Sequence, residues 1–179
     1  MWRLTKLICL GTVIVSVLSC IVMAAVRSNG LVRVTVTALD AQAEPRDHNI
    51  PLVKQKDALP DYRITVNTCD RNRIDLGAKP NESATGGLTW QMPDPISTSD
   101  IASVRLDDQD KILADAIAEV QLTGESVEVG NYRFEFKTER SMSVGIQSFF
   151  GTPIGIAISA AFTIAILLML VTAFAGIAG

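Results

Sequence analysis

The chain has 179 residues, 48% of them hydrophobic and 20% charged, with a formal net charge of −3 at pH 7 and a mean hydropathy of +0.29. That length suits one ordinary domain, but the hydrophobic share is high for a soluble one. All nineteen acidic residues and fourteen of the sixteen basic ones lie between residues 27 and 140, which leaves this central part with a charge of −5. Such a charge argues against nucleic acid as a partner.

The first predicted element is an uncharged apolar helix over residues 7–26, directly after Arg3 and Lys6. At a rise of ~1.5 Å per residue, this segment would be ~30 Å long, which matches the hydrocarbon core of a bilayer. We therefore predict a transmembrane helix. Because basic residues favour the cytoplasmic side, residues 1–6 are predicted to be cytoplasmic.

The same segment also fits a secretory signal peptide. Its charged start, apolar middle and small residues at Met23-Ala24-Ala25 match the pattern of a cleavable leader. The two interpretations differ in whether the mature chain keeps this first helix.

The central segment, residues 27–148, shows the alternation of apolar and polar residues that is typical of half-buried strands. The clearest run places Tyr132, Phe134 and Phe136 on one face of a strand. Several short strands in a chain of this size predict an antiparallel β-sandwich, with polar loops over 41–60 and 70–100 and with Trp90 in the core. The predicted strands are Leu31–Leu39, with Val32, Val34, Val36 and Ala38 inward, and Tyr62–Thr68, Ala102–Leu106, Ala118–Leu122 and Tyr132–Thr138.

The last predicted element is a second transmembrane helix within residues 149–179. No charged side chain follows Arg140, and an apolar run extends from Ile154 to Ile177. Pro153 stands before this run, at a position where the missing N–H costs a helix nothing. The run is long enough to span a bilayer with some tilt.

Each apolar segment carries a stripe of small residues spaced four apart. Small residues at this spacing let helix backbones approach closely, which is how helices associate in lipid. We therefore predict that both stripes are helix-packing faces. They comprise Thr12, Ser16, Cys20 and Ala24 in the first segment and Gly151, Gly155, Ser159 and Thr163 in the second.

The stretch Val104–Leu122, VRLDDQDKILADAIAEVQL, resembles the segment of C2 domains in which a strand ends in Asp-x-Asp and a third Asp precedes the next strand. VRVTVTALD, PDYRITV and LTWQMPDPI resemble other C2 strands in the expected order. The resemblance covers Leu31 to Thr138 and implies an eight-stranded, C2-like β-sandwich.

C2 domains often bind calcium through aspartates of two loops at one end of the sandwich. The resemblance therefore implies candidate calcium ligands, and clustered carboxylates suit a hard cation. An Asp-rich turn is also favoured by turn geometry alone, so this alternative stays open. The candidate ligands are Asp40, Asp61, Asp108, Asp110 and Asp115.

No catalytic motif stands out in the sequence. His48 is the only histidine, which excludes sites that need two or three imidazoles, and no GxSxG, Walker-type or dinucleotide-binding glycine pattern occurs. We therefore expect no enzyme activity and no required cofactor, with calcium as the ion that the C2 resemblance suggests.

Together these patterns predict a two-pass membrane protein with both termini in the cytoplasm and residues 27–148 in the periplasm or outside the cell. The expected function is that of a non-catalytic accessory subunit. Its helices would pack against other integral membrane subunits within the lipid bilayer, and its β-sandwich would brace the extracytoplasmic face. The alternative is a membrane-anchored C2-like module that binds calcium or another ligand.

Overall fold

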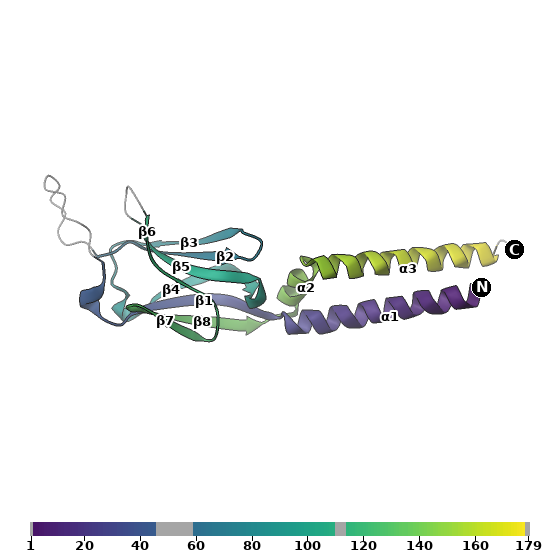
Figure 1. Ribbon diagram of the computed structural model, residues 1–179, viewed down its shortest axis with the longest axis horizontal. Coiled ribbons are helices and arrows are strands. Elements are labelled where there is room, and N and C mark those ends of the chain that lie inside the picture. Colours follow the sequence, from purple (N-terminus) through teal and green to yellow (C-terminus); the bar gives the residue numbers. More distant parts are fainter. Residues whose placement is uncertain (1, 46–58, 110–113, 178–179) are drawn as a thin grey trace. The chain divides into compact units, whose positions relative to one another are not determined.

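A computed structural model describes residues 2–45, 59–109 and 114–177 (Figure 1). The chain forms two compact units. A helical unit comprises residues 1–29 and 140–179, and a β unit comprises residues 30–139. Two antiparallel sheets thus lie between two long apolar helices in the sequence, as predicted.

The helical unit contains α1 (Trp2–Val26), α2 (Met142–Phe150) and α3 (Pro153–Ile177). Both α1 and α3 are long and apolar enough to cross a membrane. They pack against each other as an antiparallel hairpin, and the first turn of α1 and the last turn of α3 lie at the same end (Figure 1). Large apolar side chains remain exposed along both helices, as expected for surfaces that face lipid rather than water.

The sequence analysis placed one helix within residues 149–179, opened by Pro153, and did not predict the separate helix that precedes it. Residues 142–150 form the separate helix α2, and Gly151 and Thr152 make a turn before α3. Thr152 fixes this turn, because its Oγ1 accepts a hydrogen bond from the N–H of Gly155 at 3.0 Å and donates one to the carbonyl of Phe149 at 2.7 Å. Pro153 then begins α3, as the sequence predicted.

Two glycines allow backbones to touch inside the helical unit. A Cβ atom at Gly145 would lie 1.9 Å from the carbonyl oxygen of Ala24, and one at Gly155 would lie 2.0 Å from the carbonyl oxygen of Phe149. Neither neighbour is the end of a flexible side chain. The packing of α2 on α1, and the turn of α3 away from α2, therefore require glycine at these positions.

In the β unit, the described residues form eight strands in two four-stranded antiparallel sheets. The strand orders are β4-β1-β8-β7 and β3-β2-β5-β6. This architecture agrees with the predicted β-sandwich. The strands are β1 (Asn29–Ala38), β2 (Tyr62–Thr68), β3 (Arg73–Lys79), β4 (Leu88–Ser97), β5 (Ile101–Gln109), β6 (Ala114–Val120), β7 (Ser126–Val129) and β8 (Tyr132–Arg140).

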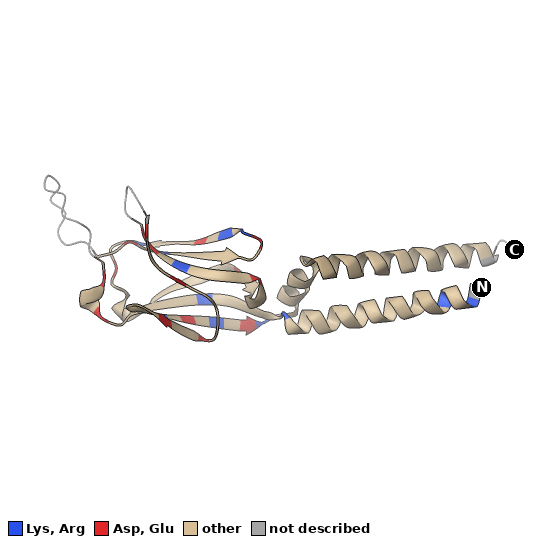
Figure 2. Cartoon of the chain, viewed as in Figure 1, with Lys and Arg blue, Asp and Glu red and all other residues tan. Residues whose placement is uncertain are grey.

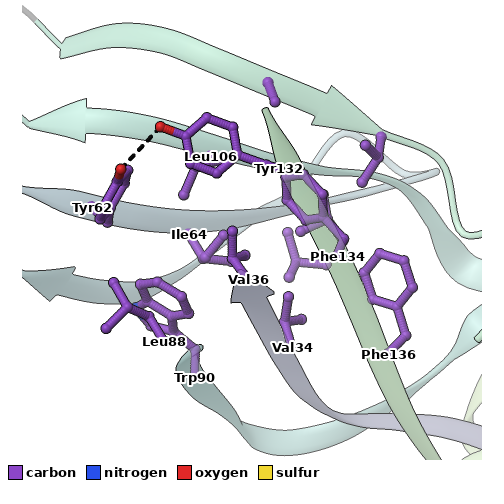
Figure 3. Packing of buried hydrophobic residues seen from close by; sticks show 14 of the residues in the cluster. Val34, Val36, Tyr62, Ile64, Leu88, Trp90, Leu106, Tyr132, Phe134 and Phe136 are labelled. Carbon is purple, nitrogen blue, oxygen red and sulfur yellow. Dashed lines mark hydrogen bonds between the residues drawn. The ribbon is translucent and has the colours of Figure 1, made fainter. Parts of the chain in front are cut away.

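The predicted alternation places one core between the two sheets (Figure 3). Side chains at alternate positions of β2 and β8 are buried, and Trp90 is buried as predicted, with its Nε1 donating to the carbonyl of Gly77 at 3.0 Å. Each large apolar side chain buried in this way contributes about 1.5–3 kcal/mol. One correction concerns β1, where an irregularity in register between Leu31 and Arg33 buries Leu31 and leaves Val32 only half-buried.

Four strands were missed by the alternation pattern or predicted with a start several residues away from the observed one, and all four lie at sheet edges. The predicted loop 70–100 contains β3 and β4, of which only β4 had been indicated by the C2 resemblance, and β7 was not predicted. β6 begins four residues earlier than the predicted strand Ala118–Leu122. Edge strands are less buried and tolerate proline, and β4 carries Pro93 and Pro95, so the apolar alternation is weak there.

We predict that alanine in place of either glycine lowers the stability of the helical unit. Gly145→Ala and Gly155→Ala should each destabilise the helical unit by about 1–3 kcal/mol, because the new methyl group cannot be accommodated without moving a backbone. The measurement is thermal unfolding of the full chain in mild detergent.

Gly11→Ala is the matched control, since a Cβ at Gly11 meets nothing within 4 Å. This change should leave the midpoint unchanged or raise it, because alanine favours the helical state over glycine. Equal melting temperatures for all three variants would contradict the assignment of Gly145 and Gly155 as contact points.

Candidate functional site

The helical unit carries an apolar groove between α1 and α3 with a volume of about 510 Å³. Small residues from both helices contribute to it, including Gly11 on α1 and Ala157 and Ala161 on α3, and all three are exposed. Because these three side chains are small and exposed, the backbone of another helix could come close to α1 and α3 at this groove. Its lining comprises Gly11, Thr12, Val15, Ser16, Ile154, Ala157, Ile158 and Ala161.

The predicted packing stripe of α1 lies on the inner face of the hairpin. Ser16 and Ala24 are buried, and Thr12 and Cys20 are half-buried. Ala24 lies against Gly145 of α2, and Ser16 and Cys20 line a second, smaller recess together with residues of α2 and α3. This stripe therefore contacts the chain's own helices.

The second predicted packing stripe, over residues 151–163, is partly buried in the helical unit and partly exposed. Gly155 is buried against the backbone of Phe149, Ser159 is half-buried, and Gly151 and Thr163 are exposed. The hydroxyls of Ser159 and Thr163 donate to the carbonyls four residues earlier, at 2.7 and 2.9 Å. These polar groups are thus satisfied within the helix, as lipid surroundings require.

Three of the predicted calcium ligands lie at one end of the β3-β2-β5-β6 sheet. Oδ1 of Asp108 accepts from the N–H of Asp61 at 2.9 Å, and Asp115 is the register partner of Asp108 on β6. Asp61 in turn accepts from the N–H of Asn81 at 2.8 Å. These hydrogen bonds give Asp61 and Asp108 a structural role in holding loop backbone.

Of the remaining two predicted ligands, Asp40 alone lies within the described residues. Asp40 caps a short helical turn by accepting from the N–H of Gln42 at 2.8 Å, and Asp110 lies outside the described residues. Within residues 2–45, 59–109 and 114–177, no group of three or more His, Cys, Asp or Glu side chains is arranged to hold a metal ion. Calcium binding therefore stays a prediction that depends on Asp110.

Sequence reasoning did not identify a buried carboxylate in the β unit. Glu44, which is 6% exposed, accepts hydrogen bonds from the hydroxyl of Tyr62 at 3.0 Å, the hydroxyl of Ser83 at 2.8 Å and the N–H of Ala84 at 2.6 Å. The hydroxyls of Tyr62 and Tyr132 lie 2.9 Å apart (Figure 3). Because the single proton of Tyr62 is given to Glu44, Tyr132 is the donor to Tyr62.

This carboxylate–tyrosine network is fully satisfied by groups of the fold itself. It joins β2 and β8, which belong to different sheets, to the segment before residue 46. The burial of Glu44 was not predictable from the sequence, because Glu44 stands in a polar segment without alternation of apolar and polar residues. The arrangement fits a structural role that fixes how the sheets pack.

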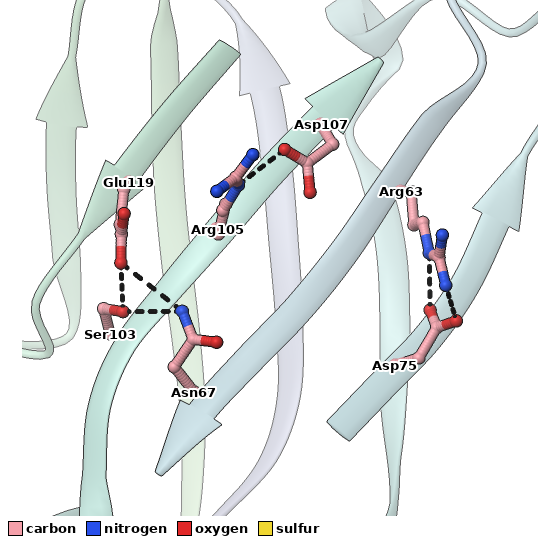
Figure 4. Close-up of polar contacts among 7 residues, drawn as sticks. All are labelled: Arg63, Asn67, Asp75, Ser103, Arg105, Asp107 and Glu119. Carbon is pink, nitrogen blue, oxygen red and sulfur yellow. Dashed lines mark hydrogen bonds and ion pairs between the residues drawn. The ribbon is translucent and has the colours of Figure 1, made fainter. Parts of the chain in front are cut away.

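The outward face of the β3-β2-β5-β6 sheet carries paired charges around a groove of about 690 Å³ (Figure 4). Arg63 makes a bidentate ion pair with Asp75 and holds the pKa of that carboxyl below its usual value. Nε of Arg105 lies 2.6 Å from Oδ1 of Asp107. Side-chain hydrogen bonds also join Asn67, Ser103 and Glu119.

Comparison with known proteins adds no assignment: no protein family, no curated protein and no solved structure matches this chain. The eight described strands in two sheets agree with the architecture that the C2 resemblance implied. Membership of the C2 family stays a hypothesis.

The tyrosine network predicts a loss of stability in alkaline solution. Burial raises the pKa of Tyr62 and of Tyr132 above the ordinary value of 10.0. The folded state therefore holds these two protons to higher pH than the unfolded chain does, so the free energy of unfolding should fall as pH rises above 10. The expected slope is about 1.4 kcal/mol per pH unit for each tyrosine.

Urea unfolding of the full chain in detergent between pH 8 and 11 measures this slope. The chain has only these two tyrosines, so a double variant, Tyr62→Phe with Tyr132→Phe, removes the effect completely. The variant should be less stable at pH 8, because Glu44 loses a donor, but should show a shallower fall above pH 10. Identical pH profiles would contradict the assignment.

Proposed function

We propose that this protein is a non-catalytic accessory subunit of a larger membrane complex, and that a transmembrane helix of a partner subunit docks in the groove between α1 and α3. The observation that carries the proposal is the groove itself, with Gly11, Ala157 and Ala161 exposed along it.

The physics of lipid supports this choice of surface. Helices in a bilayer gain nothing from hiding apolar side chains, so they associate where small residues let backbones come close. Elsewhere on the hairpin, exposed residues such as Leu167, Val171 and Phe174 are large and suit lipid chains. The groove is therefore the part of the hairpin that best suits a partner helix.

The proposed placement is two-pass, with both termini in the cytoplasm and the β unit periplasmic or extracellular. The antiparallel hairpin supports it, because the outer ends of α1 and α3 lie together. Arg3 and Lys6 favour the cytoplasmic side for that end. The β unit would then brace the partner's extracytoplasmic surface.

Adjacent alanines of α3 give a matched test of the docking groove. Ala161 lines the groove, whereas Ala160 is also exposed but is not among the residues that line it. Ala161→Leu should fill the groove and reduce the co-purified partner about tenfold, which corresponds to about 1.4 kcal/mol. Ala160→Leu adds the same side chain and the same hydrophobicity and should leave the partner bound.

The measurement is gentle detergent extraction of the tagged full chain from its native membrane, affinity purification and mass spectrometry. Recovery of the wild type without co-purifying membrane proteins would overturn the proposal. Equal recovery of one partner with both leucine variants would place the docking surface elsewhere on the chain.

A second candidate function is calcium binding by a C2-like module, for which the observation is that Asp61, Asp108 and Asp115 lie at one end of the same sheet, where Asp108 and Asp115 flank residue 110 in the sequence. If these residues and Asp110 form a site, millimolar calcium should raise the melting temperature of the full chain, because a ligand that binds only the folded state stabilises it. Asp110→Asn should abolish the shift. A wild-type melting temperature indifferent to calcium would leave Asp61 and Asp108 with their backbone contacts alone.

A further inference from the structure

The exposed side of the short helix α2 carries an apolar stripe and, next to it, a polar stripe. Met142, Ile146 and Phe150 are exposed at intervals of four residues, so they form one apolar stripe along the helix. Ser143 and Gln147 are also exposed and form a polar stripe beside it. A helix with adjacent apolar and polar stripes on its free surface suits a boundary between two solvents.

The other side of α2 is buried within the helical unit. Val144, Gly145, Ser148 and Phe149 are buried, and Gly145 contacts the backbone of Ala24 on α1. Oγ of Ser148 accepts a hydrogen bond from Nε of Arg27 at 2.7 Å. These contacts fix which residues of α2 remain free to meet the surroundings.

The charge pattern sets the depth at which α2 lies. Arg27 is the first charged residue after the apolar residues 7–26, so the hydrocarbon layer ends near it. Ala24, the contact of Gly145, precedes Arg27 by three residues, which is ~4.5 Å along a helix. Figure 2 shows charged residues only towards the two ends of α1 and none on the described part of α2 or α3.

We propose that α2 is an interfacial helix that lies in the headgroup region of a phospholipid bilayer, with Met142, Ile146 and Phe150 among the acyl chains and with Ser143 and Gln147 among the headgroups. Val22, near the end of α1, and Ile154, at the start of α3, are also exposed apolar side chains. Three side chains are too few for a stable protein interface, which buries about 800 Å² on each partner. The inference rests on the proposed crossing of a membrane, and it needs no partner subunit.

Such a helix would fix the height of the hairpin in the membrane. An interfacial helix resists movement along the bilayer normal, since sinking would bury Gln147 and Arg27 in hydrocarbon and rising would expose the apolar stripe to water. Because α2 is tied to α1 by Gly145 and to α3 by Thr152, both spanning helices would keep the same depth.

Two neighbouring positions on α2 give the test. In a full-length chain with Cys9→Ala, Cys20→Ala and Cys69→Ser, the variants Ile146→Cys and Gln147→Cys each receive an environment-sensitive fluorophore. The purified proteins are reconstituted in phosphatidylcholine vesicles without any other protein. Quenching is then measured with nitroxide-labelled lipid and with aqueous iodide.

We expect the label at position 146 to be quenched several-fold more by the nitroxide lipid than by iodide, and the label at position 147 to show the reverse preference. Ile164→Cys on α3, where the native side chain is 58% exposed, reports separately on the hairpin and should respond to the lipid quencher alone. Lipid quenching at 164 with equal iodide quenching at 146 and 147 would overturn the interfacial helix only. Iodide quenching at 164 would overturn the membrane crossing, and with it both proposals.

Discussion

The close approach of backbones at Gly145 and Gly155 is the contact on which the helical unit depends. In the proposed membrane placement, water does not drive the helices together, so packing and hydrogen bonds must hold the hairpin. Both glycines bring a peptide group directly against another helix, at Ala24 and at Phe149. The turn at Thr152, which joins α2 to α3, has its geometry only because Gly155 leaves room for the Phe149 carbonyl.

The β unit is held by different physics, since its core gains free energy from burial out of water. Alternate side chains of β1, β2, β5 and β8 fill the space between the sheets. Within this apolar core, the network of Glu44, Tyr62 and Tyr132 is the polar contact that specifies one arrangement of the two sheets. A buried carboxylate is costly unless every neighbour donates to it, and here two hydroxyls and a backbone N–H do so.

Sequence reasoning succeeded where one physical signal was strong. The apolar length of α1 and α3, the role of Pro153 and the alternation in β2 and β8 were all readable, because lipid and a two-sheet core impose simple periodicities. It missed β3 and β7 at sheet edges, where half-burial weakens the alternation. It also missed Glu44 and the helix α2, since both depend on partners that are distant in sequence. The calcium prediction stays untested, because Asp110 lies outside the described residues.

The small residues of the hairpin have two separate uses that their spacing alone does not distinguish. A Cβ added at Gly145 or Gly155 would meet backbone atoms of the same chain, so these glycines are required for packing within the chain itself. Gly11 has no such neighbour, and it lies on the open side of the helices with Ala157 and Ala161. In water an exposed alanine needs no explanation, but a lipid-facing helix gains contact from larger side chains. The small residues that remain exposed along this groove are therefore the ones that we propose for a partner helix, and they differ from the glycines that hold the fold.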